Sequence, residues 1–201
     1  MNRHLRTSLL MLAIAAGAFL STPSFAQLQS VQLVKGPTYS AGITALAPAA
    51  SASDIFLITG SATATIRVTR IECSGISTAS ATPTVALVKR STANTGGTST
   101  TPTVVPHDSN DVAGTAVVRA YTANPTAGTL VGLLRTARMT TGETASSTNP
   151  AVPLVWRFGD FGGRPIVLRG VAQSIAVNGA GNSFAAGTSL NCNIEWNETA
   201  N

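Results

Sequence analysis

Side chains able to carry out acid–base chemistry are scarce in this sequence. Charged residues make up 10% of the chain, and His107 is its only histidine after the first 26 residues. Asp108 and Asp111 lie close to it, but without a Gly-x-Ser-x-Gly motif nothing supplies a nucleophilic serine. The eight acidic residues show no spacing that would pair two of them for glycoside hydrolysis. We therefore expect a protein that is not an enzyme and that has no catalytic residues.

Motifs for metal ions and cofactors are also lacking. Asp108, Asn110 and Asp111 offer oxygen ligands, but the later acidic residue of an EF-hand loop is missing, so Asp108 and Asn110 are interpreted as closing Asx turns. The glycines of residues 178–187 do not have the G-x-G-x-x-G spacing of a nucleotide site, and this segment is interpreted as a hairpin loop. We expect no metal ion and no cofactor.

No run of basic residues and no membrane-length apolar run is present. The apolar stretch from Leu9 to Leu20 is shorter than the roughly 20 residues that span a bilayer. Arg3 and Arg6 precede it and Ser24-Phe25-Ala26 follows it, which indicates a secretory signal peptide over residues 1–26; an uncleaved anchor is the weaker alternative. The remaining domain, 27–201, has 11 basic and 8 acidic residues, and its arginines are scattered. We expect a secreted or periplasmic protein that binds no nucleic acid and has no membrane span in its mature chain.

Cysteine occurs only twice, at Cys73 and Cys192, both in the domain that we expect to be exported. Each lies on the apolar face of an alternating run, so both thiols are predicted to point into the core. An exported chain meets an oxidising compartment, which favours a disulfide between them; two buried free thiols are the alternative.

What is abundant is the pattern of short β-strands. Ten apolar or β-branched runs alternate with Gly, Pro and Asn, which predicts a sandwich or barrel. In the run 189–196, Leu190, Cys192, Ile194 and Trp196 alternate with polar residues, which is typical of a strand with one buried face. Residues 129–139 also fit helical spacing, but Gly132 within them favours a strand. Trp156, Phe158 and Trp196 fall on inward faces, so core packing is favoured over carbohydrate stacking.

One connection is unusually long. Residues 91–114, between two predicted strands, are rich in Ser, Thr, Gly and Pro. Loops of this length in compact domains are uncommon unless they bind something or are mobile. Two interpretations stay open, a functional surface and an irregular flap across a sheet edge. For the first, Asn94, Gly96, Gly97, His107 and Asp108 are the candidate partner-facing residues.

Several stretches resemble a known family. "LVKRSTANTGGTSTTPT", "VPHDS", "AVVRAYTANPT" and the closing "EW-x-E" are similar to small β-rich proteins of tailed phages and prophages, labelled as virion-associated structural or hypothetical proteins. The resemblance covers Ile66 to Glu198 and implies a β-sandwich with a non-catalytic assembly or binding role. The signal peptide departs from this family, because tailed-phage subunits assemble in the cytoplasm, so an exported relative is the alternative to a virion component.

The sequence thus predicts an all-β protein with a single antiparallel, jelly-roll-like β-sandwich. We expect a non-catalytic structural or interaction protein, with protein partners or self-assembly. The alternative is a secreted surface or matrix protein, or a module that binds a glycan or cell-surface ligand. The predicted location is secreted or periplasmic, with the virion as the alternative.

Overall fold

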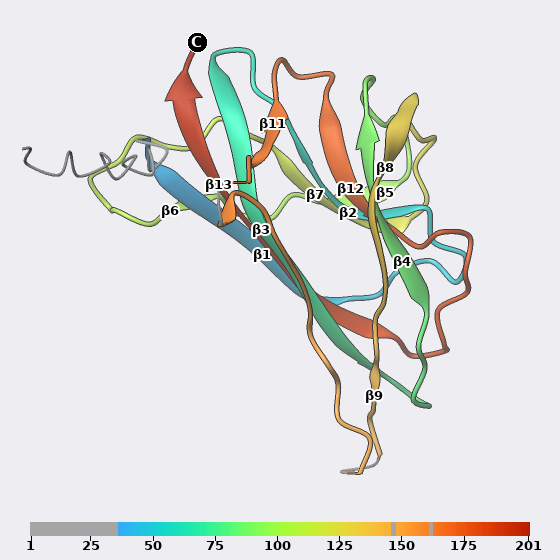
Figure 1. The fold of residues 1–201 in the computed structure, drawn as a ribbon. Coiled ribbons are helices and arrows are strands. Elements are labelled where there is room, and N and C mark those ends of the chain that lie inside the picture. The colour runs from blue at the N-terminus through green and yellow to red at the C-terminus, as the bar shows by residue number, and fades with distance from the viewer. Residues whose placement is uncertain (1–35, 146–147, 161–162) are drawn as a thin grey trace, which may run out of the picture. The chain divides into compact units, whose positions relative to one another are not determined.

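The computed structural model describes residues 36–145, 148–160 and 163–201. The expected signal peptide, residues 1–26, and the first of the ten predicted apolar runs, residues 31–35, lie outside these ranges. Every regular element in the described ranges is a β-strand (Figure 1). No helix among the described residues is long and apolar enough to cross a membrane.

Sheet A is built around two long strands. Its order is β10-β3-β13-β1-β6, and β9 and β11 also pair with β3. The strands are β1 (Thr38–Leu46), β3 (Ala64–Ser77), β6 (Val105–Pro106), β9 (Gly142–Glu143), β10 (Leu154–Arg157), β11 (Ile166–Leu168) and β13 (Ser189–Ala200). All pairs are antiparallel except β3 with β9.

Sheet B has six strands in the order β5-β7-β2-β12-β4-β8, all antiparallel to their neighbours. They are β2 (Asp54–Thr59), β4 (Thr84–Arg90), β5 (Thr98–Thr100), β7 (Val118–Ala123), β8 (Leu130–Arg138) and β12 (Ser174–Asn178). Residues 130–138 therefore form the strand predicted for them, not a helix.

The two sheets pack face to face as a jelly roll. Along the chain, β1, β2, β3 and β4 alternate between the sheets, then β8 lies in sheet B, β10 and β11 in sheet A, β12 in sheet B and β13 in sheet A. This order places each late strand beside an early one, as in a double Greek key. The prediction of an all-β antiparallel sandwich is confirmed. The hairpin interpretation of residues 178–187 was wrong, because this segment joins β12 in one sheet to β13 in the other.

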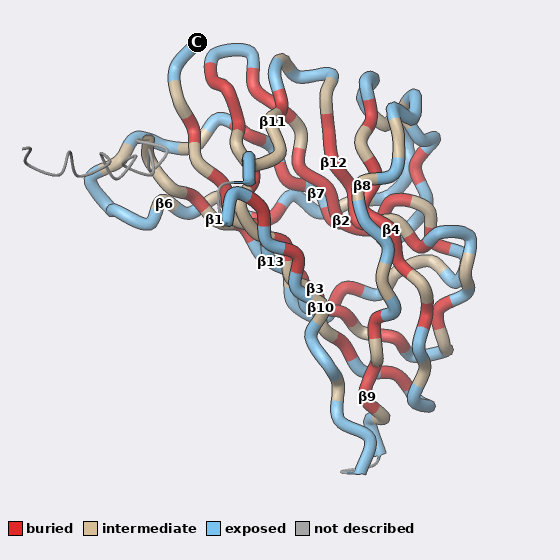
Figure 2. The backbone as a smooth tube through the Cα atoms, in the orientation of Figure 1, coloured by how far each residue is buried: buried red, intermediate tan, exposed pale blue. Residues whose placement is uncertain are grey.

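The core lies between the sheets, where each strand directs every second side chain inward. Figure 2 shows the buried segments along the long strands. Trp196, Trp156 and Phe158 are all buried in this core, as predicted, and Trp196 stacks on Tyr39 with ring centroids 6.0 Å apart.

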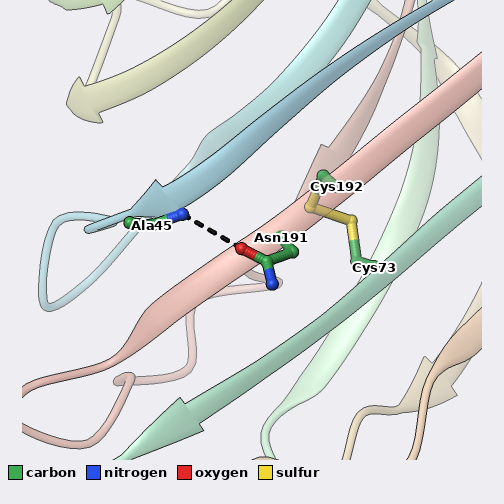
Figure 3. Close-up of a disulfide and its surroundings, with 4 residues drawn as sticks. All are labelled: Ala45, Cys73, Asn191 and Cys192. Carbon is green, nitrogen blue, oxygen red and sulfur yellow. Dashed lines mark hydrogen bonds between the residues drawn. A yellow bond between two sulfur atoms is a disulfide. The ribbon is translucent and has the colours of Figure 1, made fainter.

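A disulfide joins the two central strands of sheet A. Cys192 on β13 lies directly opposite Cys73 on β3, and their sulfur atoms are bonded at 2.08 Å (Figure 3). Both residues belong to the buried core. The predicted Cys73–Cys192 disulfide is confirmed.

Candidate functional site

The long connection between β4 and β7 has two parts, separated by β5. This short strand pairs with β7 at an edge of sheet B, and β6 then pairs with β1 at an edge of sheet A. Val104, between them, packs against the core. The structure thus shows an edge-covering flap, one of the two interpretations of residues 91–114. Its role in binding stays a prediction.

The first part of this connection crosses the outer face of sheet B. β4 ends at Arg90, beside the start of β8, whereas β5 begins at Thr98, opposite Ala123 at the end of β7. Residues 91–97 therefore run along the length of the strands, from one set of strand ends to the other. They also cross the sheet from β4 to β5, past β12, β2 and β7. Residues 124–129 make the return crossing from β7 to β8.

These two crossing segments, 91–97 and 124–129, are bonded to each other, and together we call them the strap. Thr95 and Thr126 exchange two backbone hydrogen bonds, with N···O distances of 3.0 and 2.8 Å. Gly128 packs so closely on the opposite segment that a Cβ there would lie 2.0 Å from the carbonyl oxygen of Thr92. A glycine is required at this approach.

A buried carboxylate fastens the strap to the sheet. Asp54, 1% exposed, lies at the start of β2 and accepts hydrogen bonds from Arg90 Nε (2.6 Å) and Nη2 (2.7 Å). The amides of Asn94 and Asn178 each donate a further bond to it at 2.7 Å. Asn94 also accepts a bond from the Gly128 N–H (2.8 Å), and Arg90 Nη1 donates to the Gly128 carbonyl (2.9 Å). This carboxylate on β2 therefore binds β4, β12 and residues 91–97 directly, and it is linked to residues 124–129 through Arg90 and Asn94.

The electrostatic balance at Asp54 favours the ionised form. Burial on its own raises the pKa of this carboxyl, because desolvation penalises the charge. The hydrogen bonds from Arg90, Asn178 and Asn94, together with the charge of Arg90, more than offset burial and hold the pKa below its ordinary value. The group acts as a fixed anion, which suits a structural fastener and not a proton donor.

The strap covers an apolar outer face. Five residues of sheet B are buried on the side away from the main core: Leu57, Ala86, Val88, Tyr121 and Ala176. Leu57, Ala176 and Val88 form one row across β2, β12 and β4. The Arg90 side chain reaches past this row to Asp54, because Arg90 and Asp54 lie at opposite ends of the sheet. The strap and the Arg90 side chain thus shield these residues from solvent, which explains why the outward face of sheet B can be apolar here.

A second buried carboxylate fastens the second part of the long connection. Glu198 on β13 is 6% exposed and accepts bonds from the backbone N–H groups of Thr115 (2.9 Å) and Ala116 (3.1 Å). The Thr115 hydroxyl (2.6 Å) and the Trp196 indole N–H (2.8 Å) also donate to it. The hydroxyl of Tyr39 donates to the carbonyl of Val112 (2.9 Å). Burial, then the charges of Glu198 and Asp111, raise the pKa of Tyr39.

Residues 107–113 lie between β6 and the two residues bound by Glu198. They project from the sandwich (Figure 1), and we call them the tip. His107 and Asp108 are exposed here. The Asp108 carboxylate accepts the Asn110 N–H at 2.9 Å, which is the Asx turn that the sequence indicated. Val112 is 76% exposed. The tip therefore has a hydrogen-bonded base and presents acidic and apolar side chains at its surface.

The structure separates the five candidate partner-facing residues into two groups. Asn94 is bound to Asp54 and to Gly128, and Gly97 lies against the backbone of Ala123 and Pro125. Gly96 faces open space with a φ of 64°. His107 and Asp108 lie at the tip, away from the strap.

Sequence reasoning missed the two fasteners, Asp54 and Glu198. Their partners are far away along the chain: the sequence separation is 36 for Asp54 and Arg90 and 124 for Asp54 and Asn178. The available signal was an acidic residue within an apolar strand pattern, which implies a buried partner.

Two other acidic residues of sheet A share one arginine. Glu72 and Glu195 both bind the guanidinium of Arg70, the latter at 3.0 Å, on the outer face. Within the described ranges, no three His, Cys, Asp or Glu side chains gather to hold a metal ion. No family model, curated protein or solved structure matches this chain.

Proposed function

We propose that this protein is a non-catalytic structural or interaction protein that works outside the cytoplasm, with the tip as its binding surface. The observation that carries the proposal is the use of its buried carboxylates. Asp54 and Glu198 are saturated by donors that fasten long connections to the sandwich. Acidic groups held in this way fix the shape of a surface and are poorly suited to proton transfer.

The disulfide supports the proposed location. A bond between Cys73 and Cys192 persists in oxidising compartments, such as the periplasm or the extracellular space. The signal peptide predicted over residues 1–26 provides a route to them.

The glycan-binding alternative has less support. Carbohydrate sites use exposed aromatic faces, whereas Trp156, Trp196 and Tyr121 are buried at 8%, 0% and 4% exposure. We therefore favour a protein partner over a sugar.

The proposal is tested by expressing the full chain in a bacterial host and analysing the exported fraction. We expect a product that begins at Gln27 and whose two cysteines react with a maleimide only after denaturation and reduction. A product that retains Met1 in the cytoplasm, with both thiols reactive, would contradict the proposed location. Co-sedimentation of the protein with phage particles would identify a virion component. Recovery of the free protein in the medium would identify an exported relative.

A further inference from the structure

One side of the sandwich is basic. Sheet B ends on this side at β8, and sheet A ends there at β10 and β11; Lys89 on β4 bridges the sheets by donating to the carbonyl of Val167 on β11 (3.2 Å). Six basic residues lie on the strands and turns of this side: Lys89, Arg135, Arg138, Arg157, Arg164 and Arg169. The acidic residues on the same strands and turns are Asp160 and Glu143, and Glu72 on β3, beside β10, is paired with Arg70. No ion pair between described residues neutralises any of the six.

The β8 strand on this side also exposes apolar side chains. Leu130, Val131 and Leu133 are 57%, 60% and 60% exposed, and among the strands of the described residues β8 pairs with β4 alone. Single exposed apolar residues are common, but three within four positions on an edge strand mark a contact surface. Arg135 and Arg138 are exposed further along the same strand, where they lie opposite Leu87 and Thr84 of β4.

The backbone of β8 is guarded against the addition of another strand. Its pairing with β4 shifts twice, between Leu87 and Val88 and between Lys89 and Arg90, which leaves an extra residue in β8 each time. Bulges of this kind on an edge strand oppose edge-to-edge pairing. The surface therefore suits a partner that contacts side chains, such as a loop.

The tip offers the complementary chemistry on the opposite side of the sandwich. It carries Asp108 and Asp111, and residues 101–117 contain no lysine or arginine. Val112 in the tip and Val105 at its base are 76% and 51% exposed. In Figure 1 the segment around β6 lies at the opposite side from β8, in agreement with the strand orders.

We propose that the protein self-associates head to tail, with the tip of one copy seated on the exposed β8 strand of a second copy. Acidic residues of the tip would meet Arg135 and Arg138, and Val112 would pack on the apolar residues of β8. Because the two surfaces lie on opposite sides of one molecule, the contact is heterologous and produces a ring or an open chain. This inference names the partner for the proposed binding role and therefore rests on the proposed function.

Sedimentation velocity of the purified protein over a range of concentrations tests the contact. We expect species larger than a monomer that grow with concentration and shrink at high salt, since exposed charges are screened. Asp108→Lys/Asp111→Lys and Arg135→Glu/Arg138→Glu should each weaken association by about tenfold or more, because like charges then face each other. Asp160→Lys, a matched charge change on the basic side, should not weaken it.

An equimolar mixture of the two double variants supplies the decisive result. Each variant presents like charges to itself, but the pair restores opposite charges at every contact, so association should return. A wild-type protein that stays monomeric, or variants that associate unchanged, would overturn the inference. If one double variant loses association and mixing the two variants does not restore it, the inference would also be overturned. That result would indicate a symmetric contact. A monomeric yet exported, disulfide-bonded protein would leave the proposed function standing.

Discussion

Asp54 and Arg90 place two opposite charges on the outside of a sheet and then bury them under the strap. Asp54→Asn removes the negative charge and leaves Arg90, itself only 6% exposed, without its counter-ion. Breaking one partner of a buried pair costs about 3–5 kcal/mol, so we expect the free energy of unfolding in urea to fall by that amount. Asp160→Asn, on an exposed acid, is the control and should change it by less than about 0.5 kcal/mol. Equal effects at the two positions would contradict a structural role for Asp54.

The same carboxylate gives stability a defined pH dependence. The pKa of Asp54 is lower in the folded protein than in the unfolded chain. Its contribution is therefore complete above the unfolded value of about 3.9 and is lost as the pH falls through the folded pKa. We expect the midpoint temperature of thermal unfolding to decrease as the pH is lowered below about 4. In Asp54→Asn this part of the acid dependence should disappear; an unchanged pH profile would contradict the assignment.

At the level of elements, the disulfide fixes two strands that are distant in sequence. Cys73 and Cys192 close a loop with a sequence separation of 119. We expect Cys73→Ala/Cys192→Ala to lower the free energy of unfolding by about 4–5 kcal/mol in the chain-entropy model. The variant should still fold, because β13 pairs with β3 along its whole length. Chemical denaturation measures the change, and wild-type protein under reducing conditions is the control. A variant as stable as the oxidised wild type would contradict the model.

The strap depends on the close approach at Gly128. Gly128→Ala should force the two segments apart and lower stability by about 1–3 kcal/mol, as overpacking does. Gly132 is the matched control, since no atom lies within 4 Å of a Cβ there and its φ is not positive. Gly132→Ala should therefore be neutral or stabilising by up to about 1 kcal/mol. Hydrogen exchange of residues 91–97 should increase only in Gly128→Ala; equal protection in both variants would argue against the strap.

The elements differ in how well their sequences predict them. β13 was predictable because its large apolar side chains alternate with polar ones. β1 was missed because it is built from small residues such as Ala41 and Gly42. A Cβ at Gly42 would lie 2.1 Å from Oδ1 of Asn193, so a larger residue there would displace that side chain, a neighbour that only the fold reveals. Local alternation predicts strands with a large buried face, and it misses strands shaped by close contacts.

For the molecule as a whole, composition and alternation predicted the fold class, and the cysteine faces predicted the disulfide. The candidate site was predicted only in outline. Residues 91–114 stood out by length, but their arrangement depends on distant strands: Asp54 binds Asn94 in the strap, and Glu198 binds Thr115, just after the tip. Such contacts are set by topology, and a single sequence does not display them.

The position of the last two strands has a consequence for the order in which this chain can fold. β12 lies between β2 and β4, and β13 lies between β1 and β3, so the centre of each sheet is filled by the C-terminal part of the chain. Until these strands emerge, neither sheet is continuous and Cys73 lacks its partner. A chain that crosses a membrane with its N-terminus first delivers them last. The two sheets would then be completed only on the far side of the membrane. Before β12 and β13 join them, the part of the chain that precedes these strands would remain incompletely folded and could pass through a narrow pore.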